Sequence, residues 1–208
     1  LRDNAVGHEK AKAVRGAVLQ AVAEDDGVHQ HIVADVLAPG DQRDALDYAY
    51  AQASAIVDMS ASVAVARALA RDATAPARRA SLYLNPTGTD LVLLAESADR
   101  SMRLDALEMQ YYRAIRQEPA LAGTLRGAVA RERYGRSCRD VSTQLPQARI
   151  ATLAGIGAQA LERMVDDDRP VIRVWRCDEA TLAVQAVEVP VHPMADVPVG
   201  DWRVVTDE

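Results

Sequence analysis

The chain has 208 residues, 49% hydrophobic and 26% charged, with a formal net charge of −6 at pH 7. This balance is ordinary for a soluble globular protein, and the negative charge argues against a chain built to bind nucleic acid. No apolar run approaches the roughly 20 residues of a membrane helix, and no signal peptide is predicted. The two cysteines, Cys138 and Cys177, lack metal-type spacing. We therefore expect no disulfide scaffold and assume a reducing cytoplasm.

Two features concern the origin of the sequence. It begins at Leu1 rather than at methionine, so we expect it to be a piece of a longer protein. Its basic residues are almost all arginine, and the only lysines are Lys10 and Lys12. Together with the richness in alanine and valine, this usage suggests a GC-rich bacterial coding sequence.

The first part of the chain predicts alternating helices and strands, the pattern of an α/β domain with a parallel sheet. Apolar residues at helical spacing mark the helices, and alternating or continuous apolar runs mark the strands. Asp41 is a plausible N-cap. The expected helices are 9–24, 42–52 and 63–73, and the expected strands are 28–37, 54–60 and 78–85.

The pattern changes near residue 86. The turn "PTGT" leads to a predicted strand, and amphipathic helices follow on either side of a charged, glycine-punctuated connection. The segments "PVIRVWRCDE" and "TLAVQAVEVP" predict an antiparallel hairpin, and "DWRVVTD" a final strand. The expected strand is 90–96, and the expected helices are 103–116 and 147–165. We interpret the whole as one domain, 1–208, with a change of layer between 1–85 and 86–208.

Two short segments could bind an anion or a nucleotide. Lys10 in "VGHEKA" is placed at the start of a helix, where it opposes the helix dipole unless an anionic ligand such as a phosphate is present. A solvated surface lysine is the alternative. Asp58 and Ser60 in "IVDMSAS" follow a central strand, where open α/β sheets bind ligands. Asp58 could hold a ribose or a metal, or it could cap the next helix.

Other patterns give weaker signals. The "GIG" at 155–157 falls inside a helical pattern rather than between a strand and a helix, so it predicts close helix packing and not a phosphate loop. His29 and His31 share one face of a predicted strand, but a third metal ligand is not visible. His8 and His192 do not complete a set, and there is no Gly-x-Ser-x-Gly elbow.

Cys138 lies in "RYGRSCRDVS" among several arginines. Only a thiolate is nucleophilic, and neighbouring arginines lower the pKa of a cysteine. Gly135 and Ser137 predict an exposed loop. Local sequence leaves two interpretations open: an activated thiol, and a buried inert cysteine.

The order of these segments resembles the ThiF/MoeB/HesA superfamily, the bacterial relatives of ubiquitin-activating enzymes. The segments are "VGHEKA", "IVDMSASVAVAR", "SLYLNPTGTDLVLLAE" and "SCRDVSTQLPQARIATLAGIGAQALERM", which together cover most of residues 4–165. The resemblance implies a Rossmann-like, mostly parallel sheet that lacks its first βα unit, with a helical crossover segment and a C-terminal antiparallel hairpin. It also implies a cytoplasmic homodimer.

Function and site residues follow from the same resemblance. It implies adenylation of the C-terminus of a ubiquitin-like or sulfur-carrier protein with MgATP, and transfer of the acyl group to a loop cysteine, here Cys138. Lys10 is expected to contact the ATP phosphates, Asn4 to contact the nucleotide, and Asp58 to support the nucleotide site.

The sequence also departs from the family. Ala61 stands where the family has its magnesium-binding aspartate, so magnesium binding is in doubt. The family's glycine-rich loop and arginine finger would precede Leu1. A non-catalytic dimerising scaffold that binds a small protein partner is therefore the second hypothesis. A nicotinamide-dependent Rossmann enzyme is the third, and its fingerprint is missing from the sequence.

Overall fold

The structure is a computed structural model of the chain. It describes residues 12–13, 15–16, 30–72, 74–125 and 145–193, together with the backbone of 132–133 and 141–142. The helix expected over 9–24 lies mostly outside these residues, and the strand expected at "DWRVVTD" entirely so. None of the helices in the described ranges is long and apolar enough to cross a membrane.

The chain divides into two compact units. One is drawn from the chain up to Ile56 together with Arg71–Ala77, and the other from Val57–Ala70 and from Arg78 onward. The boundary falls within the strand β1 (Ala55–Asp58), which contributes Val57 and Asp58 to the second unit.

In the first unit, a 3-10 helix, η1 (Gly40–Gln42), leads directly into the helix α2 (Arg43–Gln52). The N-cap of α2 is Gln42, without a side-chain cap, so the expectation that Asp41 caps the helix is wrong. The strand expected over 28–37 is also wrong in its described part, which is irregular and ends in a turn. The carboxylate of Asp35 accepts the amide of Leu37 at 3.0 Å, and this local bond competes with strand pairing.

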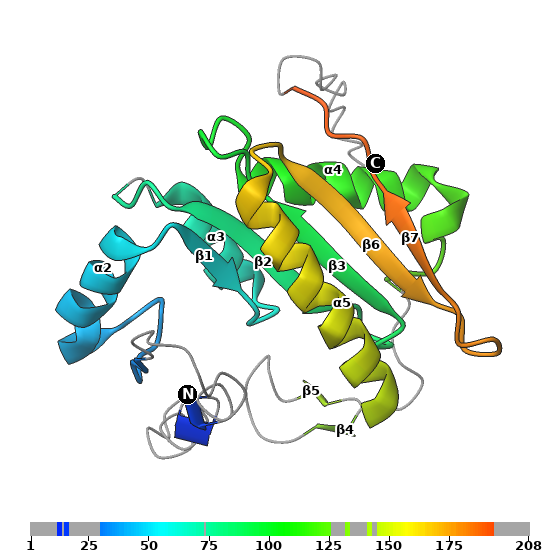
Figure 1. Cartoon of the computed structure of the whole chain (residues 1–208), viewed down its shortest axis with the longest axis horizontal. Coiled ribbons are helices and arrows are strands. Elements are labelled where there is room, and N and C mark those ends of the chain that lie inside the picture. Colours follow the sequence, from blue (N-terminus) through cyan, green and yellow to red (C-terminus); the bar gives the residue numbers. More distant parts are fainter. Residues whose placement is uncertain are drawn as a thin grey trace, which may run out of the picture. The chain divides into compact units, whose positions relative to one another are not determined.

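The sheet has five strands in the order β1-β2-β3-β6-β7 (Figure 1). Their bounds are Ala55–Asp58 for β1, Arg78–Leu84 for β2, Asp90–Ala95 for β3, Val171–Cys177 for β6 and Val184–Glu188 for β7. The pairs β2–β3, β3–β6 and β6–β7 are antiparallel, which confirms the C-terminal hairpin. A separate short pair, β4 (Glu132–Arg133) and β5 (Val141–Ser142), is also antiparallel.

The α/β class is confirmed, but the sheet is mixed and mostly antiparallel, not mostly parallel. Parallel strands need a long crossover, and α3 (Val63–Arg71) supplies one only between β1 and β2. Strands β2 and β3 are joined by the short turn 85–89, in which Gly88 has a φ of +66°. Because this connection is too short for a crossover, β3 runs antiparallel to β2.

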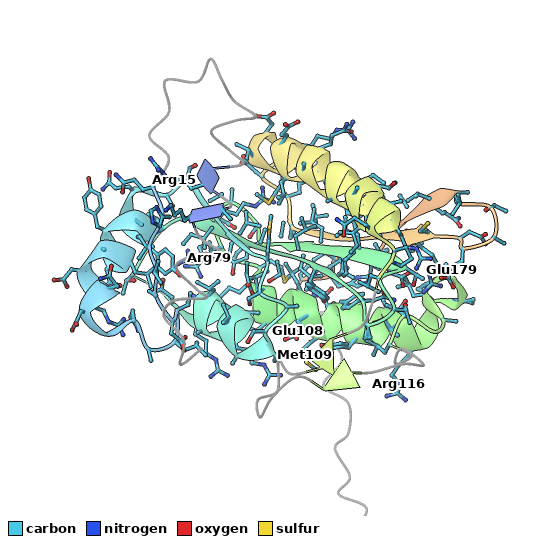
Figure 2. All side chains as sticks on the ribbon, turned by 90° about the horizontal axis from the view of Figure 1, so that it is seen from below. Arg15, Arg79, Glu108, Met109, Arg116 and Glu179 are labelled. Atoms are coloured by element: carbon cyan, nitrogen blue, oxygen red, sulfur yellow. The ribbon has the colours of Figure 1, made fainter. Side chains whose placement is uncertain are left out.

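Helices cover both faces of the sheet in the second unit. The helices α3 and α4 (Leu104–Gln117) lie on one face, and α5 (Gln147–Asp166) lies on the other (Figures 1 and 2). A short 3-10 helix, η2 (Pro119–Leu121), follows α4. The helices predicted at 63–73, 103–116 and 147–165 are therefore confirmed within a few residues.

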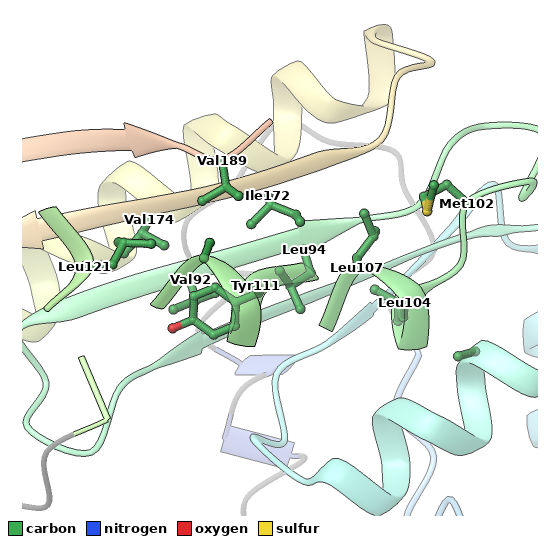
Figure 3. Close-up of a cluster of buried hydrophobic side chains, with 12 residues drawn as sticks. Val92, Leu94, Met102, Leu104, Leu107, Tyr111, Leu121, Ile172, Val174 and Val189 are labelled. Carbon is green, nitrogen blue, oxygen red and sulfur yellow. The ribbon is translucent and has the colours of Figure 1, made fainter. Parts of the chain in front are cut away.

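The main hydrophobic core lies between α4 and the sheet (Figure 3). Every second residue of a strand faces this core. Val92, Leu94 and Ile172 of the sheet pack there against Leu104, Leu107 and Tyr111 of α4. On the opposite face, Gly157 of α5 approaches β2 and β3 so closely that a Cβ there would lie 3.0 Å from Leu82. Close helix packing, predicted for the "GIG" segment, is confirmed at Gly157.

Candidate functional site

A pocket of about 290 Å³ opens in the second unit, on the face that carries α3 and α4. It lies where β1 and β2 end and α3 begins, which is the ligand-binding edge of an open α/β sheet. Its volume is near the lower limit of small-molecule sites. The polar residues of its lining are Asp58, Ser62, Arg67, Ser81, Tyr83, Asn85, Asp105, Glu108, Tyr111 and Tyr112.

The register of β2 decides which of its side chains enter the pocket. Ser81 pairs with Leu94 and Tyr83 with Val92, and both partners belong to the core on the α4 face. Because directly opposed residues share a face, Ser81 and Tyr83 point toward α4, whereas Leu82 points toward α5.

Asp58 is the predicted site residue that lies within the described ranges. It is 7% exposed and lines the pocket, and its Oδ1 accepts the amide of Ser60 at 2.8 Å. Ser60 Oγ in turn accepts the amide of Ser62 at 3.2 Å, just before α3. Asp58 thus shapes the turn that leads into α3, and its other oxygen makes no hydrogen bond to the described residues. Asp58 lies five residues before the first residue of α3, so the described bond forms a turn and is not an N-cap of that helix.

Three tyrosines give the pocket its aromatic character. Burial raises the pKa of Tyr83, Tyr111 and Tyr112, so all three are neutral phenols at physiological pH. The rings of Tyr111 and Tyr112 lie 5.7 Å apart between centroids, tilted by 37°. Tyr112 donates its hydroxyl to Glu108 Oε1 at 3.2 Å, and Glu108 adds to the increase in the pKa of Tyr112.

The charge of the lining is negative. Asp58, Asp105 and Glu108 supply three carboxylates, and Arg67 supplies one guanidinium. Arg67 Nε is 3.9 Å from Glu108 Oε2, and the Arg67 side chain is 55% exposed. So solvated a cation compensates the carboxylates only weakly.

Ser81 is the unusual polar group of the pocket. Its residue is 4% exposed, and its Oγ has no hydrogen-bond partner among the described residues. A buried hydroxyl without a partner costs about 1–3 kcal/mol. Such a group beside a pocket is satisfied when a ligand with a polar atom enters.

The other predicted site residues, Asn4, Lys10 and Cys138, lie outside the described residues. Cys177, the cysteine that is described, is free and buried in β6, away from the pocket lining. Ala61 lines the pocket with a φ of +52°, and alanine offers no ligand to a metal. Within the described ranges, no group of three or more His, Cys, Asp or Glu side chains could hold a metal ion.

Most of this pocket is not predicted by the sequence. The sequence predicts Ser81 and Tyr83 only as part of a strand, and Tyr111 only as an apolar position of an amphipathic helix. One signal was available: Glu108 and Tyr112 are four residues apart on α4, so they share a helix face. The contact of this helix face with Ser81 and Tyr83 of β2 depends on how α4 packs on the sheet, which the local sequence does not show.

No family model matches the chain, and the curated proteins give no significant match.

Proposed function

We propose that the chain is the central and C-terminal part of a ubiquitin-activating-type adenylation domain. In this proposal the longer protein activates the C-terminus of a ubiquitin-like or sulfur-carrier protein with MgATP, in the cytoplasm and as a homodimer. The observation that carries it is the pocket at the end of the β1–α3–β2 unit, beside Asp58. The segment "IVDMSASVAVAR", which resembles the family, supplies most of β1 and the first part of α3, and the position of the pocket is the usual ligand crevice of such sheets.

The described residues do not fit MgATP by themselves. A triphosphate needs cations, and the pocket lining has three carboxylates against one solvated arginine. A magnesium ion needs oxygen ligands, and Ala61 removes the family's aspartate. Binding of the triphosphate therefore depends on residues outside the described ranges, Lys10 and Asn4 in this proposal.

The test is ATP–pyrophosphate exchange by the full-length protein in the presence of candidate small protein partners, followed by a search for a thioester. Substituting Cys138→Ala is expected to abolish the thioester and leave exchange intact. Cys177→Ala is the matched cysteine control, and it should leave both signals unchanged once its melting temperature shows that it folds. A thioester that survives Cys138→Ala would contradict the role of Cys138.

A second function has its own supporting observation. Ala61 and the negative pocket favour a non-catalytic scaffold that keeps the fold and binds a small protein partner. This alternative predicts no pyrophosphate exchange, together with retained partner binding by the full-length protein in sedimentation or calorimetry. Exchange that depends on the partner would contradict it.

A further inference from the structure

The pocket beside Asp58 has a chemical preference of its own, and the adenylation proposal assigns the triphosphate to residues outside this pocket. Its apolar walls include Val63, Leu84, Leu94 and Leu104. Its polar groups are carboxylates and neutral hydroxyls, with Arg67 as the one cation of the lining. A ligand for such a site needs an apolar body, and an anionic ligand is repelled.

We propose that this pocket binds a small organic ammonium ion with an apolar body and a hydrogen-bonding group. The inference does not rest on the proposed function, because it uses only side chains of the described second unit.

The carboxylates supply the first part of the argument. Tyr112 donates to Glu108 Oε1 at 3.2 Å and orients the carboxylate, whereas the exposed Arg67 lies 3.9 Å from its Oε2 and compensates its charge only weakly. The Glu108 side chain is 13% exposed, so its charge acts at close range and is only partly screened. Asp58 and Asp105 add two further negative charges to the same lining.

The aromatic rings supply the second part. Tyr83, Tyr111 and Tyr112 converge on the pocket from β2 and α4. Tyrosine rings attract cations through their quadrupole, and clusters of aromatic rings recognise quaternary ammonium groups such as choline. Because burial raises the pKa of Tyr83 and Tyr111, these two side chains stay neutral and add no charge to the pocket.

Ser81 supplies the independent third part. Its buried Oγ lines the pocket and has no hydrogen-bond partner among the described residues, although a hydroxyl can both donate and accept. A hydroxyl or carbonyl on the ligand would satisfy it. An apolar pocket filler would leave it unpaired, so Ser81 favours a ligand with a polar atom besides the ammonium group.

Choline and 3,3-dimethylbutan-1-ol form a matched pair of probes, because they share shape and hydroxyl and differ in charge. Binding to the purified chain is followed by NMR shifts of the pocket leucine methyls and by the melting temperature. We expect choline to bind and the neutral alcohol to bind about tenfold more weakly or not at all. Equal binding of the two, or no binding of choline, would overturn the proposal.

Variants locate the effect in this pocket. Glu108→Gln should weaken choline binding about tenfold, whereas Glu162→Gln, on the exposed side of α5, should leave it unchanged. Ser81→Ala should weaken choline while leaving the affinity for tetramethylammonium, which lacks the hydroxyl, unaltered. MgATP serves as the anionic competitor. Displacement of choline by MgATP at the pocket methyls would refute the cation preference, and pyrophosphate exchange independently decides the adenylation proposal.

Discussion

Arg176 on β6 clamps Asp90 on the neighbouring strand β3. Its Nε and Nη2 donate to the two carboxylate oxygens at 3.1 and 2.9 Å, and Asp90 is completely buried. The same guanidinium donates to Thr124 Oγ1 at 2.6 Å and to the carbonyl oxygen of Ala120 at 2.6 Å. A single arginine thus joins the sheet to the segment that follows α4.

Removal of this arginine tests the clamp. Arg176→Ala leaves the Asp90 carboxylate buried without a counter-ion, and we expect it to lower the free energy of unfolding by about 3–5 kcal/mol. Arg176→Lys keeps the charge but not the two-pronged geometry, so it should cost less than the alanine variant. Urea unfolding followed by circular dichroism measures both.

The control lies on the same strand. Arg173 Nη2 pairs with Glu188 at 3.0 Å in a largely exposed ion pair. Arg173→Gln should cost at most about 1 kcal/mol. If Arg173→Gln and Arg176→Ala lower the free energy of unfolding equally, the Arg176–Asp90 pair stabilises the chain no more than an exposed ion pair does.

Glu96 organises the start of α4. Its Oε1 accepts the amide of Leu104, the first residue of the helix, at 3.1 Å, and its Oε2 accepts Arg100 Nε at 2.8 Å. Glu96→Gln removes the charge that faces both the helix dipole and Arg100, and we expect a loss of about 3 kcal/mol in the free energy of unfolding. Asp105→Asn, in the first turn of the same helix, is the matched control and should cost about 0.5 kcal/mol. A similar loss for both variants would mean that the position of Glu96 is unimportant.

Local patterns predicted most of the regular elements, although the strand expected over 28–37 and the N-cap expected at Asp41 were wrong. The apolar run at β1, the helical spacing of α3, α4 and α5, and the hairpin of β6 and β7 were all predicted close to their observed bounds. Asp58 was identified as a candidate because a carboxylate that ends a buried strand faces the edge where ligands bind.

What the sequence did not reveal depends on partners distant along the chain. The direction of β3 relative to β2 was missed, although the turn 85–89 between them is too short for a crossover. The pocket was missed because Ser81 and Tyr83 on β2 meet Glu108 and Tyr112 on α4 only after the sheet and helix pack. The unsatisfied hydroxyl of Ser81 is a property of that packing and has no sequence signature.

Asp99 gives a prediction for acid pH. The hydroxyl of Ser97, followed by the backbone and hydroxyl of Ser101, lowers the pKa of Asp99 to about 2. Because the folded-state pKa lies below the unfolded value of about 3.9, the stabilisation is fully present above pH 4. It is lost as the pH falls through about 2. A carbon-detected NMR titration of the Asp99 carboxyl measures the pKa directly, and Ser101→Ala should raise it toward the ordinary value. An unchanged titration in Ser101→Ala would show that the serine does not hold the carboxylate.

Two glycines of α5 give the last prediction, because they differ only in what surrounds them. A Cβ at Gly157 would lie 3.0 Å from Leu82 and 3.2 Å from Leu91, whereas a Cβ at Gly155 meets nothing within 4 Å. Gly155→Ala gains helix propensity and should stabilise the chain by up to about 1 kcal/mol. Gly157→Ala gains the same propensity, but its methyl group presses on the buried side chains of Leu82 and Leu91, and overpacking of this kind costs about 1–3 kcal/mol. We therefore expect a net loss of stability for Gly157→Ala and a gain for Gly155→Ala in thermal unfolding. If both alanine variants raise the melting temperature, α5 does not pack on the sheet through Gly157.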